Sequence, residues 1–141
     1  MNNASSTDEN KFLLDNPEYL ISLTKWQKTI NLLAEIFNTP TSFLVQYTNK
    51  GFQATICSQH KDNPVPVGNK GEDLDADVFC RKVVESGQEL YVNDALADPR
   101  YKDCLEVTQL GVRSYLGVPV LWPSGTPFGT LCVMDNKITD Y

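Results

Sequence analysis

The stretch VRSYLGVPVLWPSGTPFGTLCVMDN, residues 112–136, decides the fold that this sequence predicts. Apolar residues alternate with others over residues 112–121 and again over 128–134, and the turn-forming segment 123–125 lies between the two runs. Period-two alternation bounded by such residues predicts two strands joined by a tight connection. We therefore expect a β-hairpin in the middle of a sheet.

The two faces of the first of these strands differ in character, because successive side chains of a strand point to opposite sides. One face carries Ser114, Leu116, Val118 and Val120. The other face carries a guanidinium, a phenol and two residues without bulky side chains, namely Arg113, Tyr115, Gly117 and Pro119. We expect the first face to belong to the core and the second to lie where something is bound or covered.

Length and charge restrict the class of protein. The chain has 141 residues and a formal net charge of −6 at pH 7. This suits one globular domain and argues against nucleic acid or an anionic membrane as a partner, since both select basic patches. No apolar run approaches the roughly 20 residues that a membrane helix requires, and the start MNNASSTDENK lacks the regions of a signal peptide. We therefore expect a cytoplasmic domain.

The N-terminal part of the chain predicts a tail and a long helix. Residues 1–15 are mostly polar, so we expect them to form a disordered N-terminal tail. The Asn-Pro-Glu sequence at 16–18 suits the first turn of a helix, which should end before Pro40. Its apolar stripe consists of Tyr19, Leu23, Trp26, Ile30, Leu33 and Phe37. The stripe either covers one face of the sheet or shares a dimer seam, because its spacing also fits a heptad.

A second hairpin is expected from residues 41–47 and 52–58, which bracket a turn that ends at Gly51. Residues 59–73 form a long loop that contains the single histidine, His60. Because metal and triad sites need convergent partners and His60 has none at useful spacing, we expect it to be solvated.

The remaining elements are short. We expect a helix over 75–86, a strand over 89–92, helical turns within 93–101 and a brief helix over 105–110. Strands joined by tight turns pair antiparallel, and the helices must cover the faces of the sheet. The pattern therefore predicts an α+β domain.

Two segments, GQELYVNDALADPRY (87–101) and LGVRSYLGVPVLWPSGTPFGTLCVMD (110–135), resemble the second half of a GAF domain, the small-molecule sensor module of signalling proteins. The resemblance covers roughly residues 20–136. It implies a central antiparallel sheet of five to six strands, with a long N-terminal helix on one face and short helices and loops over a pocket on the other, in a GAF/PAS-like domain over residues 16–141.

The resemblance also implies a function. Such domains are sensory or regulatory parts of bacterial signal-transduction proteins, of the histidine kinase or diguanylate cyclase type, which bind a small molecule or dimerise to regulate an effector domain. They usually close with another long helix that packs beside the first one. Because the chain stops at Tyr141, we expect a fragment cut before that helix and any effector. Its uncovered first helix would favour a homodimer.

No catalytic signature is evident. Gly-rich phosphate loops, HExxH, GxSxG and kinase motifs do not occur, so we expect no enzyme. The alternative is a free methionine sulfoxide reductase-like GAF enzyme that uses Cys80 and Cys104, whose separation is close to that of two cysteines in that branch. Against it, Lys70 stands where a third cysteine would be expected, and Tyr115 where an acidic residue would be.

The cysteines suggest little other chemistry. Cys57, Cys80, Cys104 and Cys132 include no CxxC pair, and a reducing compartment would leave them as thiols. Bilin-binding members of the family pair their cysteine with a following histidine, whereas Leu105 follows Cys104. The segment 136–140 matches the NKFDE signature of cyclic-nucleotide-binding members only superficially. We expect no cofactor and no metal, and we expect Cys132 to be core packing.

A sensor pocket should combine an apolar lining with a few convergent polar groups. The candidate ligand-binding residues are Phe79, Val92, Asp94, Tyr101, Arg113, Tyr115 and Thr130. Four of these residues also have a purely structural interpretation. Asp94 would be a helix N-cap, Arg113 would form a salt bridge with a nearby aspartate, and Phe79 and Tyr115 would belong to the core. If a ligand is bound, Arg113 favours an anionic or carbonyl-bearing one, because its planar fork donates to such groups.

Overall fold

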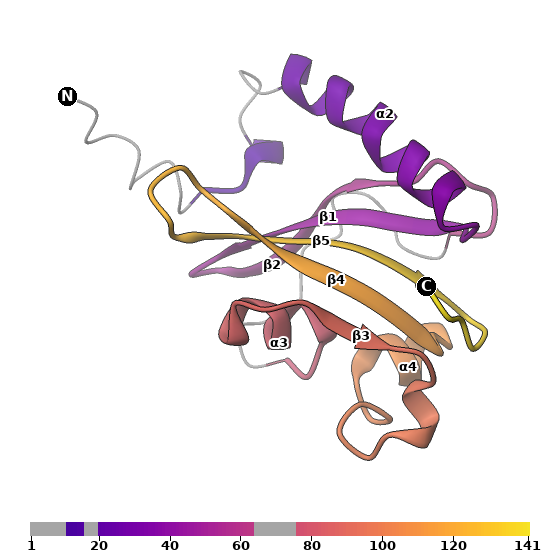
Figure 1. The fold of residues 1–141 in the computed structure, drawn as a ribbon. Helices are drawn as coiled ribbons and strands as arrows, with labels where there is room; N and C mark the ends of the chain where they lie inside the picture. The colour runs from indigo at the N-terminus through magenta and orange to yellow at the C-terminus, as the bar shows by residue number, and fades with distance from the viewer. Residues whose placement is uncertain (1–10, 16–19, 64–75) are drawn as a thin grey trace.

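The computed structural model describes residues 11–15, 20–63 and 76–141, with the side chains of 20–22 excepted, and these form a five-stranded antiparallel sheet with helices on both faces (Figure 1). The strands are β1 (Thr41–Thr48), β2 (Gly51–Cys57), β3 (Leu90–Val92), β4 (Ser114–Leu121) and β5 (Pro127–Asp135). Their order across the sheet is β2-β1-β5-β4-β3. The expected α+β architecture is confirmed.

The β4–β5 hairpin lies in the middle of the sheet, as its alternation predicts. β5 is the central strand and pairs with β1 on one side and β4 on the other. In the hairpin, Ser114 lies opposite Asp135 and Gly117 lies opposite Cys132. At Gly129, β5 approaches β1 so closely that an added Cβ would collide with the backbone carbonyl of Val45. The central pairing therefore requires a glycine at this position.

One long helix, α2 (Leu20–Ile36), lies on one side of the sheet, over β1 and β2 (Figure 1). Its residue Ile30 is fully buried and packs with apolar side chains of β1, β2 and β5. Trp26 was expected in the same stripe, but it is 43% exposed. The apolar surface of α2 is wider than the part that can face the sheet, so Trp26 stays at its margin.

The expected disordered tail is wrong for residues 11–15. Leu13–Asp15 form a short 3-10 helix, η1, and the Phe12 side chain is buried. The reason lies in β1, where the fully buried amide of Gln46 needs partners. Its Nε2 donates to the carbonyl of Lys11 at 2.7 Å, and its Oε1 accepts from the backbone N–H of Leu13 at 2.8 Å. Residues 1–10 and the expected helix start at 16–18 lie outside the described residues.

The other face of the sheet is covered by α3 (Phe79–Ser86), η3 (Ala95–Ala97) and α4 (Leu105–Leu110), which lie opposite α2 (Figure 1). The larger of the two apolar clusters lies between these elements and the sheet. It includes Tyr115, whose side chain is fully buried. The face of β4 that was expected to be bound or covered is therefore covered by chain.

The helix expected over 75–86 begins later, at Phe79. Val78 is extended, with φ −128°, and the carbonyl of Asp77 accepts a hydrogen bond from the backbone N–H of Leu105 at 2.9 Å. This contact with the start of α4 holds the chain before α3 out of the helical conformation. The predicted end of the helix is confirmed, since Gly87 caps it in the left-handed conformation, with φ 66°.

The short elements between α3 and β4 agree with their sequence predictions. β3 pairs with β4, η3 follows Asp94, and α4 ends at Gly111, with φ 73°. Among the described residues, no helix has the length and apolar character needed to cross a membrane.

Candidate functional site

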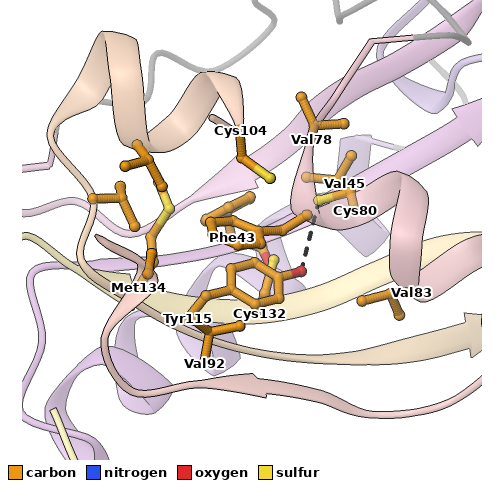
Figure 2. Close-up of a cluster of buried hydrophobic side chains, with 14 of the residues drawn as sticks. Phe43, Val45, Val78, Cys80, Val83, Val92, Cys104, Tyr115, Cys132 and Met134 are labelled. Atoms are coloured by element: carbon orange, nitrogen blue, oxygen red, sulfur yellow. Dashed lines mark hydrogen bonds between the residues drawn. The ribbon is translucent and has the colours of Figure 1, made fainter. Parts of the chain in front are cut away.

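The Tyr115 side chain lies at the centre of the layer between α3 and the sheet. Its ring stacks on that of Phe79, with centroids 4.5 Å apart, and both side chains are fully buried. The phenol folds over Gly117, where an added Cβ would collide with its hydroxyl oxygen. Figure 2 shows the hydroxyl directed toward Cys80, whose Sγ lies 3.8 Å away. A glycine in β4 thus makes room for a phenol that fills this layer.

Three polar side chains lie near the hydroxyl end of that ring, and together with Tyr115 we call them the thiol–hydroxyl cluster: Cys80, Tyr115, Thr130 and Cys132. The Thr130 hydroxyl donates to Cys80 Sγ at 3.2 Å and lies 3.7 Å from Cys132 Sγ. Cys132 Sγ in turn donates to the carbonyl of Phe43 at 3.7 Å. Burial raises the pKa of Tyr115 and that of Cys132 well above their ordinary values. The cluster therefore offers neutral hydrogen-bonding groups inside an apolar layer.

Val92 and Tyr101 complete the wall of this layer. Val92 is buried in β3, and the Tyr101 ring lies 5.9 Å from that of Phe79. On its other side, Tyr101 meets two cations, with Lys82 Nζ 5.7 Å and the Arg100 guanidinium 5.0 Å from the ring centroid. Tyr101 therefore connects the buried layer to two surface cations, each of which is paired with an aspartate.

Arg113 and Asp94 pair with each other at the start of β4. Arg113 Nη2 donates to Asp94 Oδ1 at 3.0 Å, and both side chains are partly buried. The same Asp94 oxygen accepts from the backbone N–H of Leu96 at 3.2 Å, and the Arg113 carbonyl accepts from Ala95 at 2.7 Å. Both structural roles that the sequence suggested are present: Asp94 is the N-cap of η3, and Arg113 forms a salt bridge with Asp94. These residues hold the segment before α4 onto the sheet.

The structure thus sorts the seven predicted ligand-binding residues into two groups. Five lie in one buried layer, and two form the ion pair beside it. The five are Phe79, Val92, Tyr101, Tyr115 and Thr130. Ligand binding by either group stays a prediction.

The cysteines are all free and buried. Cys104 is fully buried, and its Sγ donates to Asp77 Oδ1 at 3.7 Å. Burial, with the carboxylates of Glu106 and Asp77 nearby, raises the pKa of Cys104 to about 12. Burial alone raises the pKa of Cys57 to about 12. Neutral thiols in such surroundings are poor nucleophiles. The expectation that Cys132 packs in the core is confirmed, since its side chain is buried in the larger cluster.

A cavity that the sequence did not indicate lies at one end of the sheet. It has a volume of about 780 Å³ and is formed by the last turns of α2, the ends of β1, β2 and β5, and the approach to β4. We call it the polar groove; its polar lining residues include Asn31, Glu35, Ser58, His60, Asp135 and Lys137. These residues are far apart in the chain, and only the polar run Asp135-Asn136-Lys137 after a buried strand hinted at a site. Within the described residues, no three His, Cys, Asp or Glu side chains are placed to hold a metal ion.

Comparison with known proteins places this geometry in a family. The family model for the GAF domain matches residues 24–140. The diguanylate cyclase DgcP of Escherichia coli (strain K12) is 27% identical over 59 residues, which are 42% of this chain and 16% of that protein. The chain thus spans a small part of this curated relative.

Solved structures show the same fold. The GAF domain of the Acinetobacter phosphoenolpyruvate-protein phosphotransferase has a TM-score of 0.63 at 18% identity, over 82% of this chain and 66% of that one. The free methionine-R-sulfoxide reductase of Neisseria meningitidis, solved with its substrate, has a TM-score of 0.63 at 18% identity, over 84% and 65%. At these identities the likeness concerns the fold alone, whereas the family model covers most of the chain. The expected resemblance is confirmed, and the chain belongs to the GAF domain family.

Proposed function

We propose that this chain is the sensory module of a bacterial signal-transduction protein of the histidine kinase or diguanylate cyclase type, and that it binds a small molecule beneath α3 to regulate an effector domain. It carries no catalytic activity of its own. Family membership supports a sensory role, and the local match to a diguanylate cyclase supports the type of effector.

The thiol–hydroxyl cluster carries the proposal. Binding sites for small molecules are mostly apolar with a few placed polar groups, and this cluster sets two thiols and two hydroxyls inside an apolar layer. The ligand displaces the Tyr115 phenol, whose ring stacks on Phe79 but whose hydroxyl makes only a weak contact with the sulfur of Cys80. Phe79, Val92 and Tyr101 form the walls, and Thr130 orients the ligand. The Arg113–Asp94 ion pair lies beside this layer, and the Arg113 guanidinium favours a ligand with a carbonyl or anionic group.

A thermal-shift screen over nucleotides, amino acids and small acids tests this proposal, because a ligand that binds the folded state raises its stability. Thr130→Val removes the buried hydroxyl while keeping the shape of the side chain, so it should abolish the shift that an active compound produces. Thr29→Val, on the exposed surface of α2, is the matched control, and the compound should still produce the thermal shift in this variant. A shift that survives Thr130→Val, or a screen without any shift, contradicts the proposal.

The alternative is a reductase of free methionine sulfoxide that uses Cys80 and Cys104. It is favoured by the likeness in fold to two such reductases. Against it stands the setting of Cys104, a buried thiol whose raised pKa and acidic neighbours oppose the thiolate that attacks a sulfoxide. We expect no turnover of free methionine sulfoxide with dithiothreitol as reductant. Turnover that Cys104→Ser abolishes would establish the reductase instead.

We further propose that the domain forms a homodimer through α2 and works in the cytoplasm. The exposed apolar side chains of α2, Trp26, Leu32 and Ile36, support the dimer. Exposed apolar patches commonly mark protein interfaces.

A further inference from the structure

The polar groove is independent of the proposed sensor site, because none of the seven predicted ligand-binding residues lines it. Its volume of about 780 Å³ falls within the range of natural small-molecule sites, roughly 300 to 1,000 Å³. It lies where α2 ends and β5 leaves the sheet, and its walls combine residues of α2, β1, α4 and β5 with residues of the connecting loops.

Asp135 is the unusual residue of this groove. It lies at the end of β5, is 4% exposed, and its backbone carbonyl is fixed by a hydrogen bond of 2.8 Å from the N–H of Arg113. Its Oδ1 accepts from the N–H of Asn136 at 2.7 Å, but its Oδ2 has no hydrogen-bond partner in the described part of the chain. A buried carboxylate oxygen without a partner is unfavourable. A donor supplied by a ligand would satisfy it.

The charged residues that line the groove determine which ligand charge it favours. Carboxylates of Glu35, Asp62 and Asp135 line it, against the single ammonium of Lys137. The His60 Nδ1 accepts from the backbone N–H of Asp62 at 3.0 Å, which suits the neutral imidazole. The lining therefore carries an excess of negative charge, and it attracts a cation.

Three neutral polar side chains of the groove, those of Asn31, Ser58 and Gln59, already have hydrogen-bond partners. Asn31 Oδ1 accepts from the backbone N–H of Gln59 at 3.0 Å, and Asn31 Nδ2 donates to Gln59 Oε1 at 3.0 Å. Ser58 Oγ donates to the carbonyl of Pro40 at 2.7 Å. Because these groups have partners, recognition falls to the carboxylates. The chemistry required of the ligand is that of a hydrogen-bond donor with positive charge.

We propose that the polar groove binds a small organic cation, an amine- or guanidinium-bearing molecule whose charged head donates to Asp135 Oδ2. An organic cation fits better than a metal ion, since the described residues do not bring three ligating side chains together. Its size also suits a groove that holds the charged head at Asp135 and the remainder between α2 and the end of β2.

Titration with agmatine, a small molecule with both a guanidinium and an ammonium group, tests this inference by amide chemical shifts in 1H–15N NMR spectra. We expect saturable shifts at Ser58, His60 and Asn136. The zwitterionic relative 4-guanidinobutyrate keeps the guanidinium and replaces the ammonium by a carboxylate, so it has no net charge and should bind more weakly. Shifts spread over the surface without saturation would overturn the proposal, as would binding of both compounds alike.

Asp135→Asn keeps the oxygen that accepts from Asn136 and replaces the unpaired oxygen by a donor. It should weaken agmatine binding about tenfold or more, since it sets donor against donor at a charged hydrogen bond. Asp140→Asn, an exposed carboxylate outside the groove, should leave the affinity unchanged. Equal affinity in Asp135→Asn and the unaltered chain would overturn the proposal. If Asp135→Asn does not fold, the exposed Glu35→Gln replaces it, and an unchanged affinity there counts against the inference.

Discussion

At the scale of single residues, Tyr115 and Gly117 show how the buried layer between α3 and the sheet is filled. The two residues are on the same face of β4, and the phenol of one lies over the other. Because Tyr115 is fully buried and stacks on Phe79, a side chain added at Gly117 must displace the ring from this packing. The sequence indicated a face with little bulk, and the structure shows that the missing bulk is supplied by a neighbouring side chain.

Gly117→Ala should therefore destabilise the domain by about 1 to 3 kcal/mol, the usual cost of overpacking a core. Urea unfolding measures the change. In a Tyr115→Ala background the phenol is absent, and the same substitution at Gly117 should cost much less. If the losses in the free energy of unfolding from Gly117→Ala and Tyr115→Ala simply add in the double variant, the phenol does not occupy the space over Gly117.

The buried thiols predict a pH dependence. The pKa of Cys104 is raised from 9.0 to about 12 in the folded chain, so the unfolded thiol ionises first as the pH rises. Between these values the unfolded state binds fewer protons than the folded one, and the free energy of unfolding falls with pH, by at most about 1.4 kcal/mol per unit for one thiol. The stabilisation is fully present below pH 9.0 and is lost as the pH rises toward 12.

Urea unfolding at a series of alkaline pH values measures this dependence. Cys104→Ser should make the fall in stability shallower, because its hydroxyl does not titrate in this range. Thr108→Ser, on the exposed side of α4, is the control and should keep the steeper fall. Equal slopes in Cys104→Ser and the unaltered chain would show that this thiol does not titrate as described.

Among the elements, α2 differs from the others in the apolar surface that it leaves exposed. Trp26 is 43%, Leu32 53% and Ile36 64% exposed. All three lie outside the part of α2 that contains Ile30 and packs on β1 and β2. Of these three residues only Trp26 belongs to the heptad-like stripe expected from the sequence, and a dimer seam on this side of α2 stays a prediction.

Ile36→Glu should prevent self-association through α2, because a charge at the contact would lose its water without gaining a partner. Light scattering coupled to gel filtration should show the mass falling from that of a dimer to that of one chain, 15.8 kDa. Gln109→Glu adds the same charge to the exposed surface of α4 and should leave the dimer intact. A monomer in the unaltered chain at high protein concentration would contradict the α2 interface.

The elements that the sequence predicted are those specified by local patterns. Alternation and turn residues gave the β4–β5 hairpin, and Gly87 and Gly111 marked the ends of α3 and α4. The predictions that failed depended on distant contacts. The start of α3 is set by a backbone contact with Leu105, and the order of residues 11–15 is set by the buried amide of Gln46. Neither partner could be known from the pattern of its own segment.

At the scale of the whole molecule, the sheet separates two candidate sites. The thiol–hydroxyl cluster lies between β4, β5 and α3 (Figure 2), whereas the polar groove lies at the end of the sheet beside the end of α2. Residues of the thiol–hydroxyl cluster were among the candidates chosen from the sequence, because the chain resembles a family whose pocket lies under its short helices and loops. The sequence did not predict the polar groove, because the groove joins residues of α2 to residues that follow β5, about a hundred positions later in the chain.

The central claim is that a small molecule binds beneath α3 in place of the Tyr115 phenol. The most direct measurement is the 1H–15N NMR spectrum of the chain with and without a compound that raises its melting temperature. We predict that the largest shifts lie in α3 and at Tyr115, Gly117 and Thr130, and that Thr130→Val removes them. Shifts confined to the polar groove, with the amides of α3 and β4 unchanged, would contradict the claim.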